Sequence, residues 1–307
     1  MHDIPVTRRE FTTIAIGAAM APLLCTAAAG IVKPTRLLKA GKLDMVHGNA
    51  PLIEKFALLN RLGYDGVEIS SPNNLDPEEV IAARDATGLV IHGTVCSTHW
   101  NQPLSHVDSE VRAKGREGIE TAIRDCHRYG GDTVLVVPGI VNKSVSYAAC
   151  YERSHRELRK VLPLAVELNV RLAIENVWNN FLLSPLEAAR YVDEFESSHV
   201  GWYFDVGNIV NYGWPEHWIR TLGTRTFKID VKEFSRRKRD DEGLWKGFHV
   251  EIGEGDCDWP AVMRALQEVG FKGWATAEVG GGDEHRLRDI SERMDRVLSF
   301  EQESRQP

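Results

Sequence analysis

The chain has 307 residues, of which 43% are hydrophobic and 26% are charged, and its formal net charge is −7 at pH 7. This length can bury one large core or two small ones, and the composition is ordinary for a soluble globular enzyme. A negative net charge without a long basic stripe argues against nucleic acid as the main partner.

The first 29 residues differ in character from the rest. Thr7-Arg8-Arg9-Glu10-Phe11 precedes an apolar run from Ile14 to Leu24, and Ala27-Ala28-Ala29 offers small residues for cleavage. This pattern is typical of a twin-arginine export signal. The run is shorter than the about 20 apolar residues that a membrane-spanning helix needs, so we favour export over a retained anchor. We therefore predict a signal over 1–29, a single barrel domain over 30–307, and a periplasmic mature protein with no stable membrane association.

From residue 40 onward, strand and helix patterns alternate. Short runs rich in β-branched residues predict eight strands, near 42–47, 64–69, 89–95, 132–137, 171–175, 200–205, 225–232 and 273–279. A 3.6-residue period predicts helices over 51–62, 76–87, 109–129, 147–168, 185–195, 215–222, 259–269 and 284–300.

Eight strand and helix pairs in about 250 residues predict the α/β class and a (β/α)8 TIM barrel. A doubly wound sheet is the alternative. It would normally carry a Gly-x-Gly-x-x-Gly turn after the first strand, and Val46-His47-Gly48-Asn49-Ala50 is not one. The four cysteines beyond the signal show no Cys-x-x-Cys spacing, so we expect free or buried thiols rather than a metal knuckle. They are Cys96, Cys126, Cys150 and Cys257.

The predicted strand 225–232 alternates strictly between apolar and charged residues. In a barrel, one face of each strand meets the helical shell and the other faces the lumen. We expect the apolar set to face the shell and the charged set to face the lumen, where charges must be paired or coordinated. The apolar set is Phe227, Ile229 and Val231, and the charged set is Lys228, Asp230 and Lys232.

Several other predicted strands end in a carboxylate. Glu175, Asp205 and Glu278 each close an apolar run, and Asp230 lies near the end of its own strand. Barrel enzymes keep their active sites at this carboxyl-terminal rim. A single acid is explained equally well by an ion pair, but four acids on one rim cannot all ionise without cations. Lysines could offset part of this charge, whereas a divalent metal does so more completely. All-oxygen ligation favours Mn²⁺ or Mg²⁺ over Zn²⁺.

Seven short stretches, four of which contain the strand-end acids, follow one another along the chain. They are Tyr64–Ile69, Leu172–Asn176, Tyr203–Asn208, Phe227–Glu233, Ile252–Asp256, Asp258–Trp259 and Ala277–Glu278. In them the chain resembles the sugar phosphate isomerase/epimerase group of xylose isomerase-like TIM barrels, which includes tagatose 3-epimerase and hydroxypyruvate isomerase. The resemblance implies that Glu175, Asp205 and Glu278 bind the metal, and that Glu175 and Glu278 form the acid/base pair.

Two departures from the family pattern bear on the substrate. Asp230 stands where the family usually has a histidine ligand, so a His-x-Lys-Asp pattern here becomes Asp-x-Lys-Glu. Aspartate can still ligate, and we keep Asp230 in the predicted metal site. The family's epimerases also keep another acid beyond Glu175 that touches substrate, and Val177–Phe181 contains none. We therefore expect a substrate other than a plain ketohexose.

These features predict a metal-dependent isomerase or epimerase acting on a small-molecule sugar or keto sugar through an enediolate. One of Glu175 and Glu278 would remove the proton alpha to the carbonyl, and the other would return it. Export favours a free sugar or glycoside over a sugar phosphate. Two alternatives stay open: a lyase or hydrolase that releases the aglycone of a 3-keto-glycoside by elimination at the same metal site, and a non-catalytic sugar-binding barrel. A homo-oligomer is left open as the assembly state.

Further residues are predicted to contact substrate. His92 lies at the end of a predicted strand, pointing inward with Thr94, although a buried structural histidine is a close alternative. Trp100 could stack on a sugar ring or be an ordinary loop aromatic. Arg236 matches by its offset an arginine that touches substrate in the resembling epimerases, and His47 is a weaker candidate at the end of the first strand. The remaining predicted substrate contacts are Lys232, Glu68 and Asn208.

Overall fold

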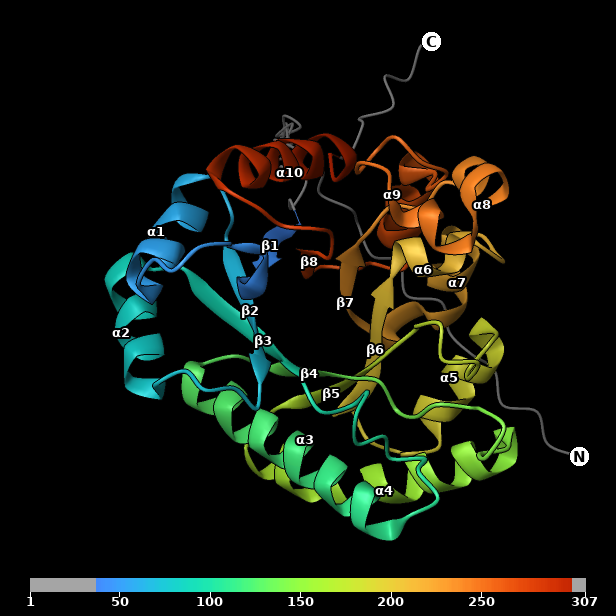
Figure 1. The fold of residues 1–307 in the computed structure, drawn as a ribbon. Coiled ribbons are helices and arrows are strands. Elements are labelled where there is room, and N and C mark those ends of the chain that lie inside the picture. Colours follow the sequence, from blue (N-terminus) through green and yellow to red (C-terminus); the bar gives the residue numbers. More distant parts are fainter. Residues whose placement is uncertain (1–36, 300–307) are drawn as a thin grey trace, which may run out of the picture. The chain divides into compact units, whose positions relative to one another are not determined.

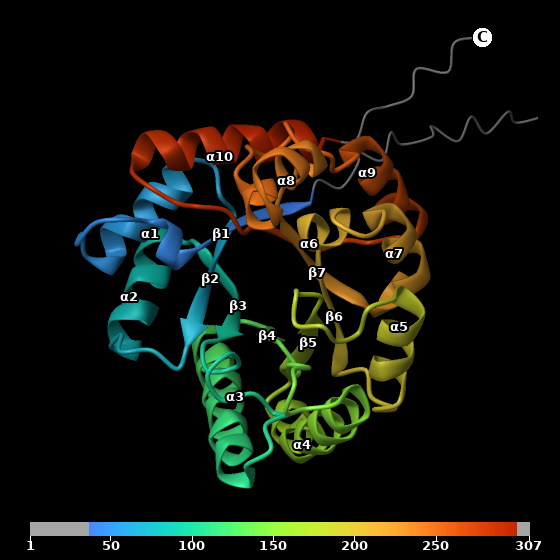
Figure 2. The same cartoon turned by 45° about the vertical axis from the view of Figure 1, so that its right-hand side comes forward.

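The computed structural model describes residues 37–299, which form a closed barrel of eight parallel strands in the order β1 to β8. Figures 1 and 2 show the strands at the centre and the helices around them. The barrel and its order confirm the fold that strand and helix alternation predicts. None of the helices within 37–299 is long and apolar enough to span a membrane.

Each strand of the barrel is followed by helix. The strands are β1 (Leu38–Lys42), β2 (Gly66–Ser71), β3 (Val90–Cys96), β4 (Thr133–Val136), β5 (Arg171–Glu175), β6 (Val200–Asp205), β7 (Thr226–Val231) and β8 (Trp274–Ala277). The helices are α1 (Leu52–Arg61), α2 (Pro77–Thr87), α3 (Ser109–Tyr129), α4 (Tyr147–Glu167), α5 (Pro185–Asp193), α6 (Val206–Val210), α7 (Pro215–Leu222), α8 (Arg236–Glu242), α9 (Trp259–Glu268) and α10 (Glu284–Val297). Three 3₁₀ turns, η1 (Leu43–Met45), η2 (Gly223–Arg225) and η3 (Leu244–Phe248), complete them.

Local chemistry explains where the helices begin and end. The side chains of Asp76, Ser184 and Asp258 accept hydrogen bonds from backbone N–H groups in the first turns of α2, α5 and α9. Gly88 and Gly130 close α2 and α3 with positive φ angles of 70° and 84°, which side chains with a Cβ rarely adopt.

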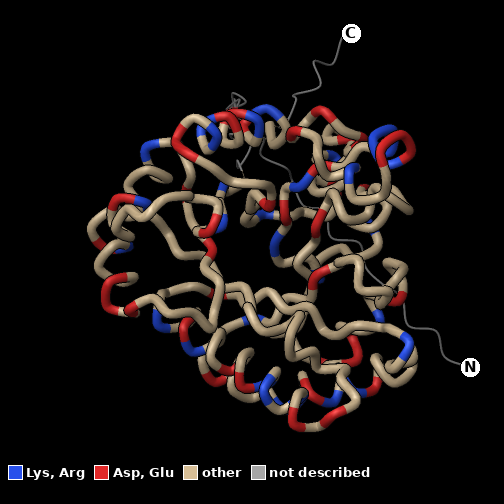
Figure 3. The backbone as a smooth tube through the Cα atoms, in the orientation of Figure 1, with Lys and Arg blue, Asp and Glu red and all other residues tan. Residues whose placement is uncertain are grey.

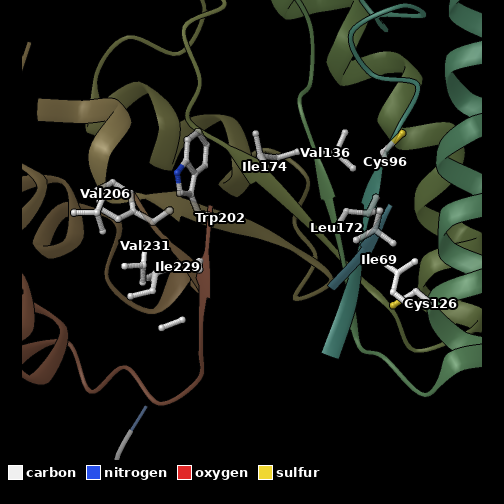
Figure 4. Close-up of a cluster of buried hydrophobic side chains, with 14 of the residues drawn as sticks. Ile69, Cys96, Cys126, Val136, Leu172, Ile174, Trp202, Val206, Ile229 and Val231 are labelled. Atoms are coloured by element: carbon white, nitrogen blue, oxygen red, sulfur yellow. The ribbon is translucent and has the colours of Figure 1, made fainter. Parts of the chain in front are cut away.

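The hydrophobic core lies between the strands and the helical shell. Outward residues such as Leu172, Ile229 and Val231 are fully buried there, and Figure 4 shows these three with Trp202 and Ile69. A smaller apolar cluster of Leu135, Ala173 and Tyr203 fills the inside of the barrel. The predicted outward positions of Ile229 and Val231 are confirmed. All four described cysteines are free and buried, as expected.

The prediction for the first strand was wrong. It placed the strand at 42–47, whereas β1 spans Leu38–Lys42 and is followed by η1. The strand has the sequence LKAGK, without a β-branched residue, and is held by pairing with both β2 and β8. Strand formation here depends on closing the barrel, which local propensity does not report. His47 consequently lies beyond the strand and is exposed.

Two irregularities in strand pairing redirect side chains away from their predicted faces. The pairing of β6 with β7 shifts so that Trp202 and Tyr203 oppose Thr226 and Lys228. Phe227 therefore has no register partner on β6. Phe227 therefore packs with the inner apolar cluster instead of the shell. The pairing of β2 with β3 skips His92 in the same way. Beyond it Thr94 faces outward, and its hydroxyl donates to the Ala122 carbonyl of α3.

Candidate active site

The four predicted acids converge at the carboxyl ends of strands β5 to β8. Glu175 ends β5, Asp205 ends β6, Asp230 is the penultimate residue of β7, and Glu278 follows β8. Asp205 and Asp230 are also direct register partners. One carboxylate oxygen from each residue lies within 4.8 Å of those of the others. We call these residues the carboxylate cluster. Figure 3 shows acidic and basic segments on the inner strands as well as on the outer helices.

The carboxylate cluster is largely withdrawn from water. Asp205 and Asp230 are fully buried and Glu175 is 5% exposed, while the side chain of Glu278 retains 28% exposure. Among the described residues, nothing donates a hydrogen bond to Oε1 of Glu175 or to Oδ1 of Asp230. Buried carboxylate oxygens without a donor are costly unless a cation meets them. This arrangement fits a hard divalent cation with oxygen ligands.

Two lysines form ion pairs with the carboxylate cluster. The Lys42 ammonium lies 2.7 Å from Oε1 of Glu278 and 3.5 Å from Oδ2 of Asp230. The Lys232 ammonium lies 2.9 Å from Oδ2 of Asp205 and 2.8 Å from Oε2 of Glu278. Lys42 is absent from the predicted site residues because the first strand was predicted too late in the chain. The signal was present, since Lys42 is the charged last residue of β1, as Glu175 and Asp205 are of β5 and β6.

Burial and charge move the carboxyl pKa values in opposite directions. Burial raises the pKa of Glu175 well above its usual value, with help from the nearby Glu278 charge. Burial also raises the pKa of Asp205 to about 7, although Lys232 opposes the shift. For Glu278, burial favours the neutral form, but Lys232 and Lys42 outweigh it and hold the pKa well below the usual range. Glu278 is therefore the anion of the cluster, while Glu175 favours its protonated form.

Hydrogen bonds to the backbone fix the position of Asp205. Its Oδ1 accepts from the Asn208 backbone N–H at 2.7 Å and so caps α6. The Asn176 amide donates to the Asp205 carbonyl at 2.7 Å and accepts from its N–H at 3.0 Å. The Asn208 amide in turn donates to the Asn176 carbonyl at 2.9 Å. The two asparagines that follow the strand-end acids thus tie β5 to β6 beneath the carboxylate cluster.

A second layer of polar residues fills the barrel interior. Both ring nitrogens of His92 are in hydrogen bonds, Nδ1 with Lys228 at 3.0 Å and Nε2 with the Thr276 hydroxyl at 3.2 Å, and its ring stacks on Trp274 with centroids 4.6 Å apart. His92 is only 2% exposed, and burial lowers its pKa well below the usual value. With both nitrogens engaged, His92 has no free polar atom for a substrate, so the geometry favours the buried structural alternative. Lys228 also pairs with Asp132 at 2.8 Å.

Of the other predicted substrate contacts, some lie beside the carboxylate cluster and others contact residues elsewhere. Glu68 is 1% exposed and lies 3.9 Å from Lys42, beside the carboxylate cluster. The Asn208 side-chain oxygen lies 3.4 Å from the Lys232 ammonium. Arg236 is turned away, because its guanidinium donates to the Val210 and Gly213 carbonyls at 2.9 Å each. Trp100, 48% exposed, packs against His99 in the loop after β3.

Comparisons with known proteins agree with the fold. The family model described as a xylose isomerase-like TIM barrel matches residues 56–299. An uncharacterized protein of Methanocaldococcus jannaschii, MJ1311, is 24% identical over 269 residues, which are 80% of this chain and 88% of that protein. The putative L-ribulose-5-phosphate 3-epimerase SgbU of Escherichia coli is 25% identical over 236 residues, which are 72% of this chain and 80% of that protein.

Solved structures of sugar epimerases share the architecture. A structure of L-ribulose 3-epimerase has a TM-score of 0.72 at 16% identity, covering 86% of this chain and 95% of that one. The 3-keto-D-glucoside 4-epimerase YcjR of Escherichia coli has a TM-score of 0.71 at 17% identity, covering 85% of this chain and 99% of that one. At these identities the likeness shows the fold, while the carboxylate cluster is a property of this chain.

Proposed function

The chain belongs to the xylose isomerase-like TIM barrel family, and from this premise we propose that it is a metal-dependent isomerase or epimerase of a free sugar or keto sugar. The observation that carries the proposal is the carboxylate cluster, with four ligand oxygens within 4.8 Å of one another on the active-site rim of the barrel. Its relatives include a putative sugar-phosphate 3-epimerase, which supports an enzyme of this kind.

The proposed metal ligands are Glu175, Asp205, Asp230 and Glu278. Their oxygen-only donor set favours Mn²⁺ or Mg²⁺. When bound, such an ion supplies positive charge that stabilises the enediolate form of the substrate. Lys42 and Lys232 supply further positive charge at the same rim. Glu68 adds a fifth carboxyl group beside Lys42. Five acids therefore meet two lysines at this rim, and the excess of acids favours binding of a further cation.

The two glutamates are proposed to move the proton. Glu278 is held anionic by two lysines and is partly exposed, so it suits removal of the proton alpha to the substrate carbonyl. Glu175, whose carboxylate oxygen lies within 4.8 Å of that of Glu278, is proposed to return a proton to the substrate. In an epimerase, delivery from the opposite side inverts the carbon.

A Glu278→Gln variant tests this assignment directly. The amide cannot accept the substrate proton, so we expect exchange of the substrate C–H with solvent deuterium to slow by about 10²- to 10⁴-fold. A suitable control is Glu268→Gln, because Glu268 lies on α9 in an exposed ion pair with Arg220. Full-rate deuterium exchange in the Glu278→Gln protein would remove the proposed mechanism.

A second candidate reaction uses the same first step. One solved structure with this fold is a 3-keto-D-glucoside 4-epimerase. In a 3-keto-glycoside, removal of the C2 proton can be followed by cleavage of the bond between C1 and the glycosidic oxygen. A C1–C2 double bond then forms, and the aglycone leaves with a proton. Release of free aglycone from a 3-keto-glucoside would distinguish this lyase, or the net hydrolase that follows from adding water, from an epimerase.

The non-catalytic alternative makes a different prediction. A sugar-binding barrel would retain affinity for the sugar without any proton exchange, with or without added metal. The same deuterium assay on the unmodified protein, supplied with Mn²⁺, therefore separates an enzyme from a binding protein.

A further inference from the structure

Four aromatic side chains form a connected surface beside the carboxylate cluster. Trp178 is at its centre, with ring centroids 4.8 Å from Phe248, 4.9 Å from Trp245 and 6.0 Å from Tyr212. We call these four residues the aromatic shelf. Trp178 follows β5, Tyr212 follows α6, and the other two belong to η3 after β7. All these segments leave the carboxyl ends of strands, so the aromatic shelf lies on the same rim as the carboxylate cluster.

The aromatic shelf is joined to the carboxylate cluster through two residues, Lys232 and Asn208. The Lys232 ammonium, which bridges Asp205 and Glu278, lies 5.5 Å from the centroid of the Phe248 ring. The Trp178 indole N–H donates to the Asn208 carbonyl at 2.8 Å, and Asn208 is the residue whose backbone N–H holds Asp205. The aromatic shelf therefore adjoins two residues that themselves contact the carboxylate cluster.

The outer part of the aromatic shelf is open to solvent. Trp245 is 65% exposed and Tyr212 is 53% exposed, although each has a half-buried aromatic neighbour in Trp178. Clustered exposed aromatic side chains at the mouth of a barrel leave apolar surface in water that a ligand can cover. Their location next to charged groups suits a ligand with a polar reacting end and a flat apolar face at the other end.

Close backbone packing fixes the aromatic shelf in place. A Cβ added at Gly247 would lie 2.3 Å from the Phe234 ring. The 3₁₀ turn η3 can therefore pack against Phe234 only because residue 247 is glycine. The Ser235 N–H also donates to the Gly247 carbonyl at 2.7 Å. Figures 1 and 2 both show α8, which leads into η3, close to α6. Trp245 and Phe248 are thus held by backbone contacts rather than carried on a free loop.

We propose that the aromatic shelf is a subsite for the group attached to the reacting sugar, so that the substrate is a glycoside and not a free monosaccharide. The inference rests on the proposed function, because the reacting ring must lie at the carboxylate cluster, and it narrows the proposed substrate to a keto sugar that carries a glycosidic group. Stacking accepts the C–H face of a second sugar ring or an aromatic aglycone, which present the same flat apolar surface. The loop Val177–Phe181 contains no acid that could contact the substrate, and it offers the Trp178 ring for stacking.

Binding of unoxidised glucosides tests the subsite without requiring turnover. The purified protein is titrated by calorimetry with the methyl, phenyl and glucosyl β-glucosides. We expect the phenyl or the glucosyl compound to bind roughly tenfold more tightly than the methyl compound. Trp245→Ala should reduce this advantage to about twofold or less and leave affinity for the methyl glucoside unchanged. Equal affinities for all three compounds, or an equal loss for all three in the variant, would overturn the proposal.

Matched variants protect the test against a general structural effect. Trp214 is exposed to a similar degree, 57%, but its ring contacts are with His217 and Arg236, so Trp214→Ala should preserve the preference. Tyr212→Ala is the second shelf variant and should weaken the preference in the same direction as Trp245→Ala. A preference lost equally in Trp214→Ala would count against the aromatic shelf.

Turnover of the corresponding 3-keto-glucosides separates failure of the aromatic shelf from failure of the proposed function. If the aromatic shelf is correct, Trp245→Ala raises KM for the phenyl or glucosyl compound and not for the methyl compound. If only the carboxylate chemistry is wrong, no compound turns over but the binding preference remains. If only the aromatic shelf is wrong, all three compounds turn over with similar KM values.

Discussion

Lys42 changes the charge of the candidate site more than any other residue that the sequence analysis left out. Its ammonium contacts Glu278 and lies within 3.9 Å of Glu68, so it takes part of the role that a metal would have. A divalent ion bound at the proposed site would compete with Lys42 for the same negative charge, and the lysine would then lower the affinity for the ion.

Replacing Lys42 by methionine should strengthen metal binding. The change removes a positive charge beside Asp230 and Glu278, so we expect Mn²⁺ affinity to rise by at least about tenfold. Isothermal titration calorimetry measures this. The control is Lys39→Met, because Lys39 is a buried lysine of the same strand that pairs with Asp295 of α10. An unchanged affinity in Lys42→Met would contradict the assignment of the carboxylate cluster as the metal site.

The raised pKa values of Glu175 and Asp205 predict how metal stabilisation depends on pH. Because these pKa values are higher in the folded than in the unfolded chain, the folded protein binds more protons above the usual carboxyl range. Stability of the metal-free protein then falls as the pH rises from about 4 towards 7. A divalent ion bound at the proposed site would replace those protons, so we expect its stabilising effect to grow over the same interval.

Thermal unfolding with and without Mn²⁺ checks this expectation. We expect the increase in Tm caused by Mn²⁺ to be larger at pH 8 than at pH 5, by roughly 4 °C or more. Treatment with a chelator should abolish the difference. An increase in Tm that is the same at both pH values would show that the buried carboxyl groups do not release protons to the ion.

At the scale of elements, one buried acid organises the connection between β7 and α9. Glu233 is 1% exposed. Its carboxylate accepts hydrogen bonds from the backbone N–H groups of Gly253 at 2.8 Å and Cys257 at 3.0 Å, and from the Trp259 indole at 2.9 Å. The acid that follows the lysine in the Asp-x-Lys-Glu pattern is therefore structural, and it holds the segment that leads into α9.

Truncating Glu233 should destabilise this connection strongly. Glu233→Ala leaves the buried N–H groups of Phe234, Cys257 and the Trp259 indole without this acceptor, so we expect the free energy of unfolding to fall by about 3 kcal/mol or more. Urea denaturation measures the change. Glu254→Ala in the same connection is the control, because Glu254 is exposed and pairs with Arg293, and a surface ion pair contributes about 1 kcal/mol or less. Similar losses in the two variants would contradict the role given to Glu233.

For the whole molecule, we propose that the protein is exported through the twin-arginine route. The predicted signal, residues 1–29, lies outside the described residues 37–299, and the proposal rests on the sequence Thr7-Arg8-Arg9-Glu10-Phe11 and the apolar run after it. Export of a folded protein agrees with a barrel whose four described cysteines are free thiols, since that fold needs no oxidising compartment.

Replacing Arg8 and Arg9 together by lysine should block export. We expect the double variant to accumulate in the cytoplasm at its full length, while the unmodified protein appears in the periplasm in a shorter form. Cell fractionation followed by mass determination measures both. Arg36→Lys, beyond the predicted signal, is the control. Periplasmic accumulation of the double variant would rule out the proposed route.

The sequence by itself determined the barrel and the acidic rim. Each strand-end acid closes a local apolar run, and in a parallel barrel all carboxyl ends of the strands lie on one side. The local pattern was therefore enough to predict that Glu175, Asp205, Asp230 and Glu278 lie together. The tertiary structure alone decided the position of β1 and hence Lys42, because that strand is stabilised by its neighbours on both sides. It also decided the orientation of Phe227 and Thr94, because a pairing shift between two strands is not encoded in the alternation of either one. The aromatic shelf depends in the same way on loops that follow β5, β6 and β7 and meet only in the folded chain.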